Sequence, residues 1–359
     1  MSMLSSEYLG IELSHPIIAA ASPLTSTFDG MRRLEDAGAA AVVMSSLYEE
    51  QIRAEDTNYT VHTEYTADCH PEASSYFPDL PDYNHGVSGH MDTLRRAAAA
   101  LKIPVIASLN GTTDDGWLDF AVMLEQAGAA ALELNLYILP IDLAVSGAQT
   151  EQRYIDIVKH VKSHVNIPVT VKLPAFFSAF GNFVSQLESA GAAGVVLFNH
   201  FFRSDIGLDT LTLEGNVTQS TPKDIHLPLT WIALLSERVK LSLAAGMGVD
   251  SHIEVIKYLL AGADVVATAS SLLRHGVEHM TTLVSGLEHW LEVGGYASVS
   301  SIRGKLDGTH LERADIHMRS QYMHTLADVW PRFGQPGGHR SVRSTNGSGG
   351  PTQQAAGTH

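Results

Sequence analysis

The sequence predicts an α/β protein, a closed (β/α)8 or TIM barrel, from a repeated unit and from the strands that lie between its copies. Four times a helix-like run ends at a glycine and passes into an apolar strand, at residues 34–46, 124–136, 187–199 and 259–270. Each glycine stands where a helix ends in left-handed backbone, and the Ala, Val and Leu that follow are typical of a strand buried on both faces. The repeated unit is therefore a helix followed by a buried strand.

A second set of apolar strands opens at a proline or a polar turn between these copies. Interleaving the two sets gives eight strands, near residues 17–22, 40–46, 104–109, 131–136, 168–173, 194–199, 240–245 and 264–269. Helical stretches separate most of them, which is the element order of the barrel. An open doubly wound sheet is the alternative. Neither of its usual nucleotide fingerprints, G-x-G-x-x-G or G-x-x-x-x-G-K-[ST], occurs in the chain.

Length and composition predict a single barrel domain over residues 1–333. The chain has 359 residues, of which 45% are hydrophobic, enough for one large core. Residues 334–359 are rich in Gly, Ser and Pro and have few apolar side chains, which predicts a flexible tail.

Charge and cysteine content exclude several classes of partner. The formal net charge of −16 argues against binding to nucleic acid or to an anionic membrane, because both need a basic surface. The single cysteine, Cys69, excludes an internal disulfide and a cysteine-rich metal site, and no metal is expected. No signal-peptide pattern and no uncharged run of about 18 residues occurs, so we expect a soluble, cytoplasmic protein.

Two connections are too long to be simple loops. Residues 47–90 follow the second strand, and residues 200–226 follow the sixth and contain LDTLTLEGNV, whose alternation predicts a hairpin. Both follow carboxyl ends of strands, where barrels place their active sites. We expect a lid or substrate wall, with a subunit contact as the alternative.

Polar residues at the ends of apolar strands mark the candidate site, because a buried polar group needs a partner or a ligand. Lys172 is the most informative, since a charged side chain inside the strand VTVKLP is costly without an anionic partner. Either Glu133 on the neighbouring strand neutralises it, or it stabilises an electron-rich ligand. The full set is Ser22, Ser45, Ser46, Ser108, Asn110, Glu133, Asn135, Lys172, Asn199, Ser270 and Ser271.

Two short loops follow the last two strands, at residues 244–251 and 268–276. Both combine glycine or other small residues with the start of a helix, a pattern that binds phosphate in many barrels. The alternative is that Gly246 and Gly248 only turn the chain.

Together these motifs resemble the dihydroorotate dehydrogenase family of FMN-binding barrels, over roughly residues 7–310. The matching segments are HPIIAAAS (15–22), IPVIASLNG (103–111), LELNL (132–136), VKLP (171–174) and RGKLDG (303–308). The resemblance implies an FMN cofactor and hydride transfer between flavin N5 and a small substrate such as dihydroorotate, as in pyrimidine biosynthesis.

The resemblance also implies a role for individual residues. Ser46 and Asn135 would hydrogen-bond the flavin ring, and Lys172 would stand near its N1/O2 edge and stabilise the reduced anion. Gly246, Gly248, Ala269 and Ser270 would hold the phosphate. Ala269 stands where the family usually has Gly. The implied cofactor-binding residues are Ala20, Ala21, Ser22, Ser46, Asn135, Lys172, Asn199, Gly246, Gly248, Ala269 and Ser270.

The substrate side departs from the family pattern. The Cys or Ser that takes a proton from dihydroorotate aligns with Ile138, which cannot accept one. A family lysine aligns with Ser45, and an asparagine that holds orotate aligns with Tyr76. Tyr137 could replace the base only if its pKa, ordinarily near 10, is strongly perturbed. The resulting catalytic candidates are Lys172, Asn135 and Tyr137, and the substrate-binding candidates are Ser45, Tyr76 and Asn199.

Two other functions stay open. One is an inactive flavin-binding barrel that serves as subunit or regulator of a redox assembly. The other is a flavin-free phosphosugar-type lyase or isomerase, for which Glu133 stands nearly alone as a strand-end carboxylate. No cysteine cluster could bind iron and sulfur, so electrons must pass to a diffusible acceptor or to a redox partner protein. The resemblance further implies a homodimer, and Cys69 is expected to be an ordinary loop residue.

Overall fold

The computed structural model describes residues 3–49, 86–111, 118–199, 203–216, 219–306 and 322–324. The chain divides into two compact units, Met1–His310 and Leu311–His359. The predicted flexible tail, Cys69 and Tyr76 lie outside the described residues, and so does the predicted domain boundary at residue 333. These predictions therefore stay predictions.

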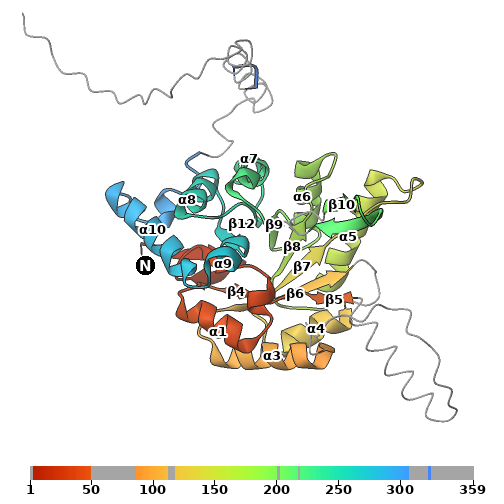
Figure 1. Ribbon diagram of the computed structural model, residues 1–359, viewed down its shortest axis with the longest axis horizontal. Coiled ribbons are helices and arrows are strands. Elements are labelled where there is room, and N and C mark those ends of the chain that lie inside the picture. The colour runs from red at the N-terminus through yellow and green to blue at the C-terminus, as the bar shows by residue number, and fades with distance from the viewer. Residues whose placement is uncertain are drawn as a thin grey trace, which may run out of the picture. The chain divides into compact units, whose positions relative to one another are not determined.

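Eight parallel strands close into a barrel in the first unit (Figure 1). Strand order runs β4, β3, β13, β12, β9, β8, β7, β6, and the ring closes where Val42 of β4 pairs with Val105 of β6. The predicted (β/α)8 barrel is confirmed, and the open sheet is wrong. The strands are β3 (Ile17–Ala19), β4 (Val42–Val43), β6 (Val105–Gly111), β7 (Ala131–Leu136), β8 (Val169–Leu173), β9 (Gly194–Leu197), β12 (Ser242–Ala245) and β13 (Val265–Thr268).

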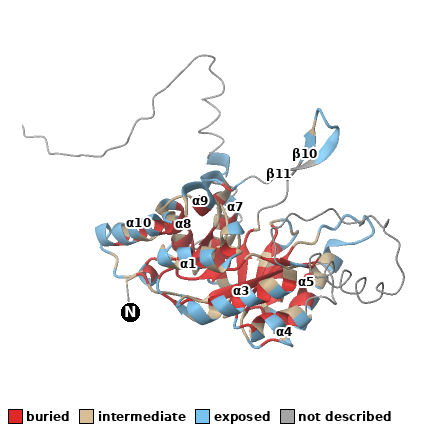
Figure 2. Ribbon diagram, turned by 60° about the horizontal axis from the view of Figure 1, so that its bottom comes forward, coloured by how far each residue is buried: buried red, intermediate tan, exposed pale blue. Residues whose placement is uncertain are grey.

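Helices surround the barrel, and Figure 2 shows buried strands inside a ring of helices whose outer faces are exposed. The helices are α1 (Phe28–Asp36), α3 (Gly86–Ala100), α4 (Leu118–Gln126), α5 (Gly147–Lys162), α6 (Phe180–Ser189), α7 (His226–Leu235), α8 (His252–Ala261), α9 (Ser270–His275) and α10 (His279–Val293), with short 3-10 turns η1 (Pro23–Thr25), η2 (Pro222–Ile225) and η3 (Val299–Ser301). In the described part of the chain, none of the helices combines the length and the apolar character that a membrane span requires.

The glycines of the repeated unit adopt the predicted left-handed backbone. Gly38, Gly128, Gly191 and Gly262 have φ angles of 93°, 99°, 98° and 112°. Each comes directly after or within two residues of a helix end and before a buried strand. The repeat is therefore a helix stop followed by a strand start, as the sequence indicated.

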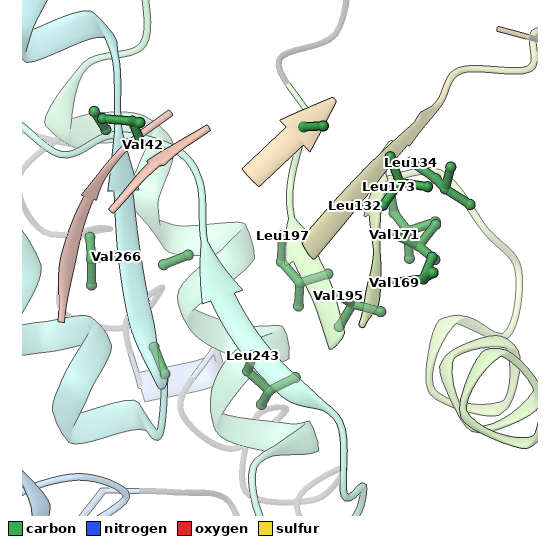
Figure 3. Close-up of a cluster of buried hydrophobic side chains, with 14 of the residues drawn as sticks. Val42, Leu132, Leu134, Val169, Val171, Leu173, Val195, Leu197, Leu243 and Val266 are labelled. Carbon is green, nitrogen blue, oxygen red and sulfur yellow. The ribbon is translucent and has the colours of Figure 1, made fainter. Parts of the chain in front are cut away.

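Two apolar clusters share the barrel wall, because alternate side chains of a strand point to opposite faces. The outward side chains of β7, β8 and β9 pack against helices, and Figure 3 draws this outer cluster, including Leu134, Val171 and Leu197. The inward cluster combines small or branched strand residues, such as Ile18 and Ala244, with Tyr8 and its neighbours near the amino terminus. The inward positions nearer the carboxyl ends of β6, β7 and β8 are polar, and they form the candidate site.

A short hairpin that the sequence did not predict closes the amino-terminal end of the barrel. It consists of β1 (Ser6–Tyr8) and β2 (Ile11–Leu13). The buried Tyr8 hydroxyl donates to Thr170 Oγ1 at 3.3 Å, and burial raises its pKa. The Leu9 N–H donates to Ser242 Oγ at 3.0 Å. Because Thr170 and Ser242 lie at the amino-terminal ends of β8 and β12, the hairpin covers this end of the barrel.

The second predicted strand, residues 40–46, is interrupted. Its regular part is β4, and a continuation, β5 (Leu47–Tyr48), pairs with the same neighbour, β6. Residues 44–46 lie between the two pieces, and the Ser45 N–H points to the Thr25 carbonyl at 3.4 Å. The interruption places Ser45 and Ser46 at the carboxyl end of the barrel.

The second insertion contains the predicted hairpin, formed by β10 (Arg203–Gly207) and β11 (Thr212–Asn216). In Figure 2 the hairpin stands away from the barrel. Four of its apolar side chains are exposed, namely Ile206, Leu208, Leu211 and Leu213. Most of the first insertion lies outside the described residues, so a lid there stays a prediction.

Candidate functional site

The polar strand-end residues gather into two clusters at the carboxyl end of the barrel. The lysine cluster consists of Ser46, Ser108, Glu133, Asn135, Lys172 and Asn199. The glycine–serine cluster consists of Ser220, Gly246, Gly248 and Ser270.

In the lysine cluster, Lys172 Nζ lies 3.7 Å from Glu133 Oε1. The two side chains come from the adjacent strands β8 and β7 and are only 13% and 5% exposed. Ser108 donates to the same carboxylate oxygen at 3.2 Å, and its Oγ lies 2.8 Å from Ser46 Oγ. The ion pair with Glu133 that the sequence left open is therefore confirmed.

The long separation of the pair leaves Lys172 able to bind something else. A charge-assisted N–H···O bond is normally about 2.7–2.9 Å long, so the 3.7 Å contact neutralises the charge without a short hydrogen bond. An ammonium group carries three N–H donors. Lys172 can therefore remain paired with Glu133 and still donate to a ligand.

Two asparagines flank the lysine. Asn199 Nδ2 donates to Asn135 Oδ1 at 2.7 Å, and Asn135 is the register partner of Lys172 across β7 and β8. The backbone N–H of Asn199 donates to the Leu173 carbonyl at 2.8 Å, which fixes the chain just after β9. In this arrangement the Asn135 amide presents donors and Asn199 presents an acceptor.

The glycine–serine cluster joins three loops. The Gly248 N–H donates to Ser220 Oγ at 3.2 Å, and Ser220 donates through its backbone N–H and its hydroxyl to Ser270 Oγ at 3.2 and 3.1 Å. The Tyr258 hydroxyl of α8 donates to the Met247 carbonyl at 2.7 Å and so fixes the glycine loop to α8. Burial raises the pKa of Tyr258. Sequence reasoning missed Ser220. The only signal for it was the capping pattern Thr221-x-x-Asp224, which marks the return of the insertion to the barrel.

The remaining described candidates lie at the same end of the barrel. The Ala20 N–H donates to the Thr268 carbonyl at 2.9 Å, which sets the end of β3 beside Ala269. Ser22 caps η1 through Thr25. Ala20, Ala21, Ser22, Ser45 and Ala269 are all half-buried. Tyr76 lies outside the described residues. The described residues hold no group of three His, Cys, Asp or Glu side chains that could bind a metal ion.

Comparison with curated proteins gives this geometry a family context. The chain is 28% identical over 227 residues to dihydroorotate dehydrogenase A (fumarate) of Aeropyrum pernix, which covers 62% of the chain and 73% of that relative. It is 25% identical over 310 residues to the catalytic subunit of dihydroorotate dehydrogenase B (NAD(+)) of Pyrococcus abyssi, covering 84% and 98%. The chain is a divergent dihydroorotate dehydrogenase-like protein. No family model matches it.

A third relative supports the same family context. The Methanosarcina acetivorans catalytic subunit of dihydroorotate dehydrogenase B (NAD(+)) is 27% identical over 305 residues, covering 82% of the chain and 93% of the relative. The names of these relatives describe oxidoreductases, and several describe catalytic subunits. The resemblance stated from the sequence is thus confirmed for the family and the fold.

In this dihydroorotate dehydrogenase-like protein the loop after β7 is held by a residue that sequence reasoning missed. The backbone N–H of Ile138 donates to the Tyr154 hydroxyl of α5 at 3.1 Å. Tyr154 packs edge-on against Phe177 and Phe183, and burial raises its pKa to about 12. Tyr137, which follows β7 directly, is half-buried. The Tyr154 hydroxyl therefore anchors the backbone at Ile138 in the loop after β7.

Proposed function

We propose that the chain is an FMN-dependent oxidoreductase that transfers hydride between flavin N5 and a small anionic or heterocyclic substrate. The observation that carries the proposal is Lys172, largely enclosed at the carboxyl end of the barrel beside Glu133 and next to the Asn135–Asn199 pair. A buried cation that keeps free donors suits a ligand on which negative charge accumulates. The names of the relatives support the same chemistry.

The residues present fit FMN. A Cβ on Gly246 would lie 3.2 Å from the Phe198 carbonyl oxygen and 3.3 Å from Val196 Cγ1, so this loop leaves little room for a side chain. Gly248, Ser270 and Ala269 are the proposed phosphate-binding residues together with Gly246, because small residues leave room for a phosphate and the Ser270 hydroxyl can donate to one. Ser46, Asn135 and Lys172 are the proposed partners of the ring, and Ala20, Ala21, Ser22 and Asn199 are proposed to surround it.

When bound, FMN would supply two-electron redox chemistry, and the protein would tune its charge. Lys172 would offer a positive charge to the ring, and Glu133 would partly offset that charge. Because Ser108 and Ser46 hydrogen-bond behind Glu133, the carboxylate cannot turn away from the lysine easily. Asn135 and Asn199 hold each other and orient the ligand edge that they face.

The proton on the substrate needs a different acceptor from the one the family uses. Ile138 is apolar, and Tyr154 stays protonated because its pKa is about 12. Tyr137 is our candidate for the acid–base group, and Ser45, Tyr76 and Asn199 are our candidates for binding substrate. Dihydroorotate is the first substrate to test.

The second candidate is an inactive flavin-binding barrel that acts as subunit or regulator of a redox assembly. It is favoured by one observation, the apolar Ile138 at the position of the base. An active enzyme would pass its electrons to a diffusible acceptor or to a redox partner protein, and an inactive barrel would act on such a partner. For either candidate we propose a cytoplasmic homodimer.

The first test is the visible spectrum of the protein purified without added cofactor, repeated after anaerobic addition of dihydroorotate. Flavin bands would support the proposal, and their bleaching would show that the base has been replaced. Persistent bands would leave the inactive barrel or another substrate. A colourless protein that also fails to bind added FMN would contradict both candidates.

A variant pair makes the assignment specific. Lys172→Ala should lose bound FMN or slow flavin reduction, whereas Lys159→Ala, at an exposed position on α5, should do neither. Equal FMN content and equal reduction rates in the two variants would remove Lys172 from the site.

A further inference from the structure

The segment that returns from the β10–β11 hairpin to the barrel contributes one buried side chain to the glycine–serine cluster. Ser220 is 8% exposed and lies between the loop after β12 and the start of α9. Its hydroxyl accepts from Gly248 and donates to Ser270. Ser220 thus connects two loops that lie far apart in the sequence and that we assign to the cofactor phosphate.

The bonds that Ser220 makes determine what Ser270 can do. A serine hydroxyl has one hydrogen to donate and two lone pairs that accept. Ser270 Oγ accepts from the Ser220 N–H at 3.2 Å and from the Ser220 hydroxyl at 3.1 Å, which uses both lone pairs. Ser270 can therefore take part in a third hydrogen bond only as a donor, and a phosphate oxygen is an acceptor.

Ser220 is itself held from behind. The Arg274 Nη2 group donates to the Ser220 carbonyl oxygen at 2.7 Å, and Arg274 Nη1 is paired with the Asp250 carboxylate. The neighbouring turn η2 packs so closely on the glycine loop that a Cβ on Gly248 would lie 2.8 Å from the Ile225 nitrogen. These contacts fix the Ser220 side chain relative to both loops.

We infer that Ser220 is a positioning residue that makes Ser270 a hydrogen-bond donor to the phosphate of the flavin cofactor, with Arg274 and Asp250 as its support. This inference rests on the proposed function. It extends that function by assigning to Ser220 the orientation of the Ser270 hydroxyl.

The test compares two flavins that differ only in the phosphate. The full-length protein is stripped of flavin, and FMN and riboflavin are titrated by quenching of flavin fluorescence. Ser220→Ala should weaken FMN binding by about tenfold, the effect of one bond to a charged group, and leave riboflavin binding unchanged. Ser220→Thr keeps the hydroxyl and should restore FMN affinity to within about threefold. Ser285→Ala, at an exposed serine whose hydroxyl donates to the Thr282 carbonyl of its own helix, α10, is the matched control.

Each outcome has a distinct meaning. Equal weakening of both flavins by Ser220→Ala would show a merely structural role and overturn the inference, as would unchanged FMN affinity. If the wild-type protein binds neither flavin, the proposed function fails first. Where riboflavin binds too weakly to titrate, the ³¹P resonance of bound FMN gives a second readout. The resonance should shift in Ser220→Ala and in Arg274→Gln but not in Ser285→Ala. An unshifted resonance in Ser220→Ala would overturn the inference.

Discussion

At the scale of single residues, the most consequential feature is the pair formed by Lys172 and Glu133. Burying both charges costs hydration energy that their attraction does not reliably recover, so such a pair is poor support for stability. Its place at the carboxyl end of the barrel gives it a functional explanation, since the pair sets the local charge that a ligand experiences.

Glu133→Gln tests this explanation. The substitution keeps the shape and the Ser108 contact but removes the negative charge that offsets Lys172. The anionic reduced flavin should then be favoured, and the midpoint potential should rise by tens of millivolts, at roughly 30 mV for each 1.4 kcal/mol in a two-electron couple. Equilibration with a reference dye measures the potential, and Glu237→Gln at an exposed site is the control. A lowered or unchanged potential would contradict the role of Glu133.

Tyr154→Phe tests the support of the loop after β7. The ring keeps its edge contacts with Phe177 and Phe183, but the Ile138 N–H loses its acceptor. We expect faster hydrogen exchange at the Ile138 amide and a loss of about 1 kcal/mol in unfolding free energy. Protection at Ile138 equal to that of the wild type would show that the loop is held by other contacts.

At the scale of elements, the loop after β12 is restricted by its neighbours as well as by its own turn. Gly248 has a φ of 75°, and a Cβ there would lie 2.8 and 2.9 Å from backbone atoms of Ile225 and Thr221. Both constraints exclude a side chain. The glycine is therefore required by the approach of the second insertion.

Gly248→Ala should displace residues 221–225 and with them Ser220. We expect a folded barrel that has lost most of its FMN, because the strain, about 1–3 kcal/mol, is local. Flavin content per chain and circular dichroism measure the two effects. Gly147→Ala, where a Cβ meets nothing within 4 Å, should change neither. Full FMN content in Gly248→Ala would show that the loop does not bind the cofactor.

The sequence predicts elements best where local chemistry decides them. The eight strands and the glycines at 38, 128, 191 and 262 followed from apolar runs and helix-ending positions. The hairpin of β1 and β2 escaped prediction because strands of three residues carry almost no pattern. Ser220 and Tyr154 escaped because their roles arise from contacts between segments that are distant in the sequence.

At the scale of the whole molecule, we expect acid to destabilise the fold through His90, which is buried without a hydrogen-bond partner for its Nε2 among the described residues. His90 on α3 is 6% exposed, its Nε2 has no hydrogen-bond partner among the described residues, and burial lowers its pKa to about 4. The unfolded chain takes up this proton near pH 6.5, but the folded chain does so only near pH 4. Stability from this group is therefore present above pH 6.5 and is lost as the pH falls towards 4.

His90→Leu should remove this loss. The lowered pKa corresponds to a loss of about 3 kcal/mol in the free energy of unfolding of the wild type by pH 4. The stability of the variant relative to the wild type should therefore rise steadily as the pH falls from 6.5 to 4. Urea unfolding at pH 7, 6 and 5 measures the difference, with exposed His160→Gln as the control. Parallel pH profiles for wild type and His90→Leu would show that His90 does not limit acid stability.

The hairpin that closes the amino-terminal end of the barrel has a consequence for biosynthesis. Its anchors are late in the chain: Leu9 bonds to Ser242, Ser6 Oγ bonds to the Asp264 carbonyl oxygen, and β3 pairs with β13. These partners of β1 and β3 are therefore synthesised well after the strands themselves. Until β13 is synthesised, the edge of β3 that pairs with it is open, and an open strand edge can pair with another molecule.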